Sequence, residues 1–323
     1  MSECHDDYEG RAMRKNVFLA VFAVIVLGIV VAGVGLPYLH PAAPGADTIG
    51  ILSIPNIVGS SGPYVLAAPF PDVNESYPVY RTVLPGNGTG EKRRLDNLFG
   101  VSGDAKTPEP SAGSVYYYVN SGAFQYIIPE KAYPYTTHQQ PDIPSDEETR
   151  AIATAYLKER GLLSDGVYFE DVSVGSSCGS IGPTVTEYIL TKHVHFIKKI
   201  QGLRVYNAGI TVSIGENGEV VAVSNSLRKF DPKPVRDVKI IMPEQACQRL
   251  CSGNLTKDPL PWEYDKIMVT DISLGYWMEI QTEPQEYIAP VYAFSCTATW
   301  NGKSAEVVRY VPAVDPAEME GLT

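Results

Sequence analysis

Two histidines separated by one residue are the groups in this chain whose type and spacing best suit chemistry. His193 and His195 fall in a stretch that we expect to be a strand, so both imidazoles project from one face. Glu187, six residues before His193, points to the same face, and the three side chains together are possible metal ligands. Because Val194 and Phe196 occupy the opposite, apolar face, we favour a solvated strand face over a metal site.

Other catalytic patterns are missing from the sequence. It contains no HExxH, no GxxxxGK[ST], no GxGxxG opening a helix after a strand and no GxSxG elbow that leads from a strand into a helix. The acidic groups at 146–148 and 216–219 belong to a predicted helix start and a turn, where a solvated surface explains them. A serine triad is recognised by geometry rather than by order, so the sequence leaves it open. We therefore expect no enzyme, no cofactor and no metal.

An apolar run near the N-terminus predicts a membrane anchor. Val17–Leu36 holds twenty residues without a charge, which at 1.5 Å per residue spans roughly 30 Å of hydrocarbon. No Lys or Arg follows until Arg81, so the positive-inside rule places the N-terminus in the cytoplasm and the rest outside. The alternative is a cleaved signal peptide. Three basic residues precede the run: Arg11, Arg14 and Lys15.

Cysteines and sequons fit that exterior location. Cys4 is expected to stay reduced in the cytoplasm, and the four others, in an oxidising exterior, permit two disulfides with three possible pairings. These four are Cys178, Cys247, Cys251 and Cys296. Because Cys247 and Cys251 share a predicted helix face, we expect bridges to other elements. Three possible glycosylation sites are present: Asn74, Asn87 and Asn254.

Changes in composition and hydrophobic pattern along the chain predict six segments. They are a cytoplasmic tail (1–15), a transmembrane helix (16–36), a Pro/Gly-rich tether (37–71), a small α+β module (72–144), a second module (145–235) and a third module with the tail (236–323). Ser145 with Glu148 forms a capping box, so a helix begins there. Strands are expected at 169–175, 184–200, 203–214 and 220–226, with Gly202 in a tight turn.

The same order of elements recurs in the last third. A helix is expected from Pro243 to Leu250, followed by strands at 267–277, 289–299 and 305–311. A helix followed by antiparallel strands thus occurs twice, with a shorter version before. We predict an α+β fold in which helices cover one face of antiparallel sheets, built from repeated modules behind the anchor.

The hairpin around Gly202 carries a family resemblance. Val194, Phe196, Gly202 and Val205 match the V-x-F-x-Q-x-x-x-G-x-x-V pattern of PepSY-like and thermolysin-propeptide-like (FTP) domains, with Lys198 in place of the usual Gln. The segment from 242 resembles a second PepSY pattern. Behind one anchor helix, this tandem is similar to Yyc-type extracytoplasmic regulators of two-component sensor kinases. The resemblance covers roughly residues 145–311 and implies protein or peptide binding without catalytic residues.

The expected function follows from these features. A formal net charge of −11 repels phosphate backbones, so nucleic acid is an unfavourable partner. We expect a single-pass protein of the cell membrane, held in the bilayer by Val17–Leu36, whose exterior domain binds a protein or peptide and modulates a sensor kinase or protease. The alternatives are a passive cell-surface structural protein and a metal-dependent hydrolase on the same scaffold.

Overall fold

The fold was obtained as a computed structural model, which describes residues 64–86, 88–101, 113–133, 140–181, 184–252 and 264–319. The predicted anchor Val17–Leu36, Cys4 and the sequons at Asn87 and Asn254 lie outside the described residues, as does the side chain of Cys178. Within the described ranges, no helix is long and apolar enough to cross a bilayer.

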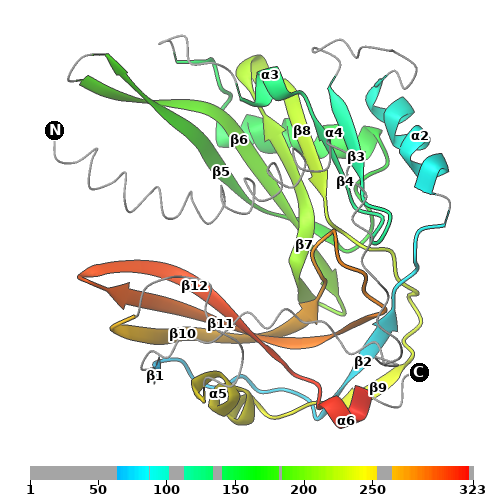
Figure 1. Cartoon of the computed structure of the whole chain (residues 1–323), viewed down its shortest axis with the longest axis vertical. Helices are drawn as coiled ribbons and strands as arrows, with labels where there is room; N and C mark the ends of the chain where they lie inside the picture. Colours follow the sequence, from blue (N-terminus) through cyan, green and yellow to red (C-terminus); the bar gives the residue numbers. More distant parts are fainter. Residues whose placement is uncertain are drawn as a thin grey trace, which may run out of the picture.

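Six antiparallel strands form the first sheet, shown in green and yellow-green in Figure 1. In spatial order they are β3 (Ser114–Tyr117), β4 (Phe124–Ile127), β8 (Val220–Asn225), β7 (Leu203–Ile214), β6 (Thr184–Ile200) and β5 (Val167–Ile181). Turns set the register: Gln201 and Gly202, at φ 50° and 81°, connect β6 to β7 as a tight hairpin.

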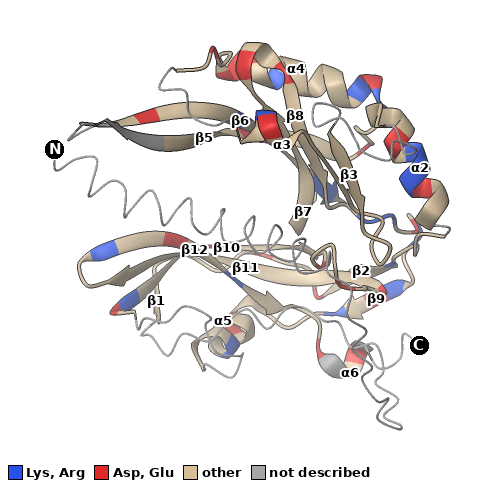
Figure 2. Ribbon diagram, turned by 45° about the horizontal axis from the view of Figure 1, so that its top comes forward, with Lys and Arg blue, Asp and Glu red and all other residues tan. Residues whose placement is uncertain are grey.

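One face of the first sheet is apolar and carries the helices α4 (Asp146–Glu159) and α2 (Gly88–Phe99). Val194, Val212 and Val223 stand opposite one another on β6, β7 and β8. Leu157 of α4 and Phe99 of α2 belong to the same core. Burial of such side chains contributes roughly 1.5–3 kcal/mol each. Figures 1 and 2 show these helices on the outer side of the sheet.

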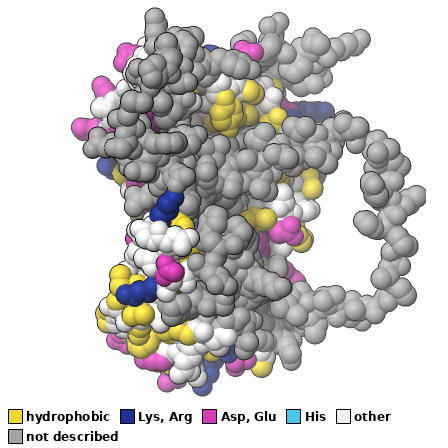
Figure 3. Space-filling model, turned by 60° about the vertical axis from the view of Figure 1, so that its left-hand side comes forward, with side chains coloured by type: hydrophobic (Ala, Val, Ile, Leu, Met, Phe, Trp, Pro, Cys, Tyr) yellow, Lys and Arg dark blue, Asp and Glu magenta, His cyan; other side chains and the backbone are white. Residues whose placement is uncertain are grey.

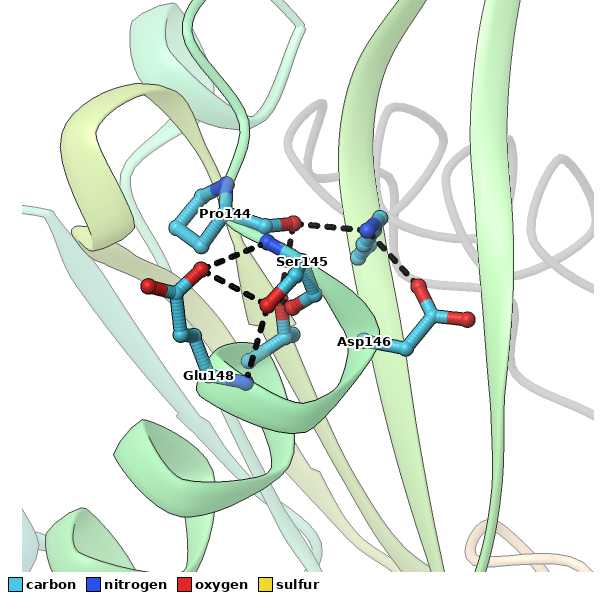
Figure 4. A network of polar contacts seen from close by, with 6 residues as sticks. Pro144, Ser145, Asp146 and Glu148 are labelled. Carbon is cyan, nitrogen blue, oxygen red and sulfur yellow. Dashed lines mark hydrogen bonds and ion pairs between the residues drawn. The ribbon is translucent and has the colours of Figure 1, made fainter.

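The start of α4 is held by the predicted capping box (Figure 4). The Glu148 N–H donates to Ser145 Oγ at 3.3 Å, and the Ser145 N–H donates to Glu148 Oε2 at 2.9 Å. Lys192 of β6 donates to the Pro144 carbonyl and pairs with Asp146 at 2.7 Å. These contacts attach the helix start to the sheet and satisfy N–H groups that a helix leaves free.

A second sheet contains β10 (Lys266–Trp277), β11 (Tyr287–Trp300) and β12 (Lys303–Pro312), all antiparallel. β1 (Tyr64–Leu66) adds to β10 in parallel, and β2 (Ser76–Arg81) pairs with β11 and with β9 (Arg236–Lys239). The helix α5 (Pro243–Cys251) covers one face over its own apolar core. Three short elements complete the described part of the chain: α3 (Pro129–Ala132), the 3₁₀ turn Glu216–Gly218 and α6 (Pro316–Met319).

The two sheets meet where β7 pairs in parallel with the end of β10. Val205 and Tyr206 stand opposite Tyr276 and Trp277, and beyond them β7 pairs with β8 instead. Asn207 separates the two pairings at φ 59°, a left-handed conformation that Asn tolerates better than most residues. From this joint the sheets spread apart, with their helices on the outer sides (Figure 1).

The structure is a mixed, strand-rich fold with few helices, in which antiparallel pairing dominates and two pairings are parallel. The predicted strands at 184–200 and 203–214 coincide with β6 and β7. The described strands of segment 72–144 divide between the two sheets: β2 joins the second sheet, while β3 and β4 join the first. Membership of a sheet therefore does not follow the division expected at residue 144.

Candidate functional site

The face of the first sheet opposite α2 and α4 carries a band of hydroxyl, imidazole and amide groups. We call it the hydroxyl–histidine face. Its members alternate with the apolar residues along each strand and line up across the sheet: Asp171, Ser173, Thr191, His193, His195, Thr211, Ser213, Ser224 and Gln125. The face is turned toward the second sheet (Figure 2). Neither long helix of this sheet covers it.

His193 lies at the centre of this face between two hydroxyl groups. Its Nδ1 is 2.8 Å from Ser213 Oγ and its Nε2 is 3.4 Å from Thr191 Oγ1. Burial, with a smaller contribution from the neighbouring His195, lowers the pKa of His193 to about 4. The ring is therefore neutral at physiological pH, with one nitrogen donating and the other accepting.

His195 has the same arrangement one position further along the strand. Its Nε2 is 2.8 Å from Ser173 Oγ, and its Nδ1 is 3.2 Å from Thr211 Oγ1. Burial lowers the pKa of His195, whereas the carboxylates of Asp171 and Glu170 act in the opposite direction. Ser173 is thus at the distance that a nucleophile keeps from its base. The Thr211 hydroxyl lies at the other ring nitrogen, where a triad has a carboxylate.

The three side chains weighed above as possible metal ligands do not come together. Glu187 shares the strand with the histidines, but its carboxylate accepts a hydrogen bond from Ser176 Oγ at 2.5 Å, on the part of the β5–β6 hairpin that extends past β7. The two imidazole centroids are 6.5 Å apart. Among the described residues, no group of three or more His, Cys, Asp or Glu side chains is placed to hold a metal ion.

Gly175 gives the histidines their room, and the sequence analysis did not identify it. A Cβ at this position would lie 2.4 Å from Thr191 Oγ1 and 2.8 Å from His193 Nε2. Only a residue without a side chain fits on β5 next to this ring. The signal available in the sequence was a glycine at the last position of a predicted strand, and a glycine in a strand often marks a close approach of neighbouring groups.

The second sheet borders the face at the joint. The Tyr206 hydroxyl lies 2.9 Å from Ser273 Oγ, and the Tyr206 and Tyr310 rings pack with their centroids 5.4 Å apart. Arg204 forms a two-point ion pair with Glu170, in which one nitrogen–oxygen distance is 3.0 Å. Side chains of both sheets therefore meet along this edge of the hydroxyl–histidine face.

The remaining predicted site residues lie elsewhere. Cys247 and Cys296 are buried between α5 and the second sheet, Cys251 is exposed, and all three are free thiols in the structure. Burial raises the pKa of Cys247 to about 11 and that of Cys296 to about 12, so both thiols are protonated and weakly nucleophilic.

Asn74 is exposed, as a glycosylated residue must be. In the view of Figure 3, apolar and charged side chains alternate over the part of the molecule that holds the second sheet.

Comparison with known proteins assigns a class to the centre of the site. Residues 191–227 match the fungalysin/thermolysin propeptide motif, and this range holds the end of β6 together with β7 and β8. The chain thus contains a propeptide-like domain whose strands carry most of the hydroxyl–histidine face.

No curated protein matches the chain. Among solved structures, it is similar to that of an uncharacterized protein from Eubacterium rectale ATCC 33656, with 12% identity over 77% of this chain and 86% of that one. The TM-score is 0.40. No function transfers at that level of similarity.

Proposed function

We propose that this chain is a membrane-anchored extracytoplasmic protein that binds another protein or a peptide on its hydroxyl–histidine face. The observation that carries the proposal is the row of neutral hydroxyl and imidazole groups on the strands of the propeptide-like motif. Such groups donate and accept hydrogen bonds without a net charge, which suits the N–H and C=O groups of a polypeptide. Glu170 and Arg204 at the border already neutralise each other.

A regulatory role is the finer part of the proposal. The resemblance to Yyc-type regulators, together with the predicted anchor Val17–Leu36, supports modulation of a sensor kinase or protease in the same membrane. In this view the anchor raises the local concentration of the domain beside its partner, so a weak interface is sufficient. The passive structural protein is the alternative without a partner.

Site-specific photocrosslinking tests the binding face. A photoreactive amino acid replaces Asp171, which is exposed on the hydroxyl–histidine face, or Lys158, which is exposed on the outer surface of α4. We expect Asp171 to capture one specific protein in intact membranes and Lys158 to capture none. Equal capture from both positions, or no adduct from Asp171, would contradict the proposed face.

The anchor is tested separately through Cys251, the exposed thiol of α5. In a chain with Cys4 and Cys178 replaced by Ser, a membrane-impermeant maleimide added to intact cells is expected to label Cys251. Labelling only after lysis would place the domain in the cytosol and remove the exterior location. Hydrolysis of a peptide that stops in Ser173→Ala would instead favour a hydrolase in which Ser173 is the nucleophile.

A further inference from the structure

The loop between β10 and β11, residues 278–286, is bound by side chains from the first sheet, and we call it the junction loop. Arg228, just after β8, is its main contact and is 5% exposed. Its guanidinium donates to the carbonyls of Glu279 at 3.3 Å, Ile280 at 2.7 Å and Glu283 at 2.5 Å. It also donates to the Asn120 carbonyl at 3.3 Å, so one side chain bridges both sheets.

Three further side chains of the first sheet hold the same loop. Asn207 donates to the Met278 carbonyl at 2.9 Å, Asn120 to the Thr282 carbonyl at 3.1 Å, and Ser121 to the Gln281 carbonyl at 2.7 Å. Within the loop, Gln285 accepts from the Glu279 N–H at 2.9 Å and donates to the Trp277 carbonyl at 3.0 Å. The joint is therefore a buried polar network, whose strength depends on every member being satisfied.

Besides Arg228, whose Nε has no hydrogen-bond partner, Glu279 is a member of this network with an unsatisfied atom. It is 3% exposed, and its Oε1 is buried without a hydrogen-bond partner. Arg228 bonds to four carbonyls, and the described residues contain no ion pair between Arg228 and Glu279. A buried carboxylate oxygen in this state is costly when ionised and much less so when protonated.

The groups facing the carboxyl of Glu279 decide its charge. Burial, with a smaller contribution from the Glu283 carboxylate, raises the pKa of Glu279 to about 7. The Trp277 indole, the Arg228 guanidinium and the Ile280 amide act in the opposite direction without overcoming burial. The acid therefore titrates within the range of environmental pH.

We propose that Glu279 is a proton-binding group that couples the joint between the two sheets to pH. With one proton taken from solvent onto the carboxyl, the junction loop is closed against Arg228, Asn207 and Ser121. Loss of that proton leaves a buried charge that the groups around it do not fully offset, and this loosens the loop. This coupling does not depend on the proposed binding face.

The direction follows from linkage. A freed Glu279 has an ordinary pKa of 4.5, whereas in the closed joint the pKa is about 7. Between these values the closed form holds a proton that the open form releases, so rising pH favours opening. The joint is most stable below about pH 4.5, and this contribution is lost by pH 7.

Hydrogen exchange of the full chain tests the coupling. Protection factors of amides in residues 278–286, corrected for the intrinsic pH dependence of exchange, are measured at pH 5.5 and pH 8. We expect them to be at least about tenfold lower at pH 8 in the wild type. Glu279→Gln, which keeps the shape and stays neutral, is expected to show equal protection at both values.

Glu286→Gln is the matched control, because Glu286 lies in the same loop, is exposed and is not among the groups that shift the pKa of Glu279. This variant should retain the wild-type pH dependence. Equal wild-type protection at both pH values would overturn the proposal even if Glu279→Gln failed to fold. A pH effect that persists in a folded Glu279→Gln variant would overturn it as well.

Discussion

At the scale of single residues, Gly202 is where backbone conformation alone dictates the residue type. Its φ is 81°, and an added Cβ would meet no atom within 4 Å. The cost of Gly202→Ala therefore comes from the left-handed conformation and not from crowding. We expect a loss of about 1 kcal/mol in the free energy of unfolding, measured by urea denaturation of the full chain.

Gly86→Ala is the matched control for this change. A Cβ at Gly86 also meets nothing within 4 Å, but its φ is not in the left-handed region. We expect an unchanged or slightly higher stability there, because alanine restricts the unfolded chain. Equal losses at both positions would contradict the conformational explanation.

At the residue scale, the sequence predicts which strand face the two histidines share but not which hydroxyl groups they contact. Spacing alone placed His193 and His195 on one face, since alternation is a property of the strand itself. Their partners Ser173 and Ser213 come from the neighbouring strands, about twenty residues away in each direction. Identifying them requires the register, which the β-bulge near Asp171 shifts by one residue.

At the scale of elements, β6, β7 and β8 were predictable because clear turns bound them and alternation marks their faces. The pairing of β2 with β9 was not predictable, since the partners lie about 160 residues apart and the sequence of neither strand indicates which strand it pairs with. The parallel pairing of β1 with β10 has the same origin. Local pattern thus predicts strands, whereas their assembly depends on burial over the whole chain.

Gly275 controls how closely β7 and β10 approach. A Cβ on Gly275 would lie 2.4 Å from the Arg204 carbonyl oxygen and 2.4 Å from Tyr206 Cε2. Because the first of these atoms is backbone, Gly275→Ala is expected to separate the strands. We predict a loss of about 3 kcal/mol in unfolding free energy. Faster exchange of the Met278 amide, which donates to the Tyr206 carbonyl, should accompany it.

Gly209→Ala distinguishes the joint from general crowding. Its Cβ would lie 2.5 Å from the Phe196 carbonyl oxygen, between β6 and β7 inside the first sheet. We expect a similar loss of stability, but the Met278 amide should remain protected relative to global unfolding. If both variants exposed Met278 equally, Gly275 would have no special role at the joint.

At the scale of the whole molecule, two separate apolar cores are linked by a small third one. One core lies under α5 and the other under α2 and α4. The link consists of a few buried residues from both sheets: Tyr80, Ile200, Val205, Tyr276, Met278 and Ile288. The polar junction loop lies beside this small core. A charge in the loop therefore weakens the contact between the two sheets at a place where few buried apolar side chains stabilise it.

Two buried groups in different parts of the molecule have opposite effects on its pH dependence. His193 has a pKa of about 4 in the folded chain against an ordinary value of 6.5, so its effect destabilises the fold as pH falls through this window. Glu279, at about 7 against 4.5, destabilises the fold as pH rises. Each effect is at most about 3 kcal/mol, and the two nearly cancel between pH 4.5 and 6.5.

Single variants should therefore reveal pH dependences that the wild type conceals. We consider unfolding free energies from urea denaturation at pH 4.5, 5.5 and 6.5. In the wild type, the summed contribution of these two groups to the unfolding free energy should be nearly constant over this range. They should rise with pH in Glu279→Gln, where only the histidine effect remains, and fall with pH in His193→Asn, where only the carboxyl effect remains. The double variant should be flat again. If unfolding free energy changed with pH in the same way in Glu279→Gln and in the wild type, this carboxyl would have an ordinary pKa. Only a proton that the folded chain holds and that unfolding releases can give the two curves different slopes.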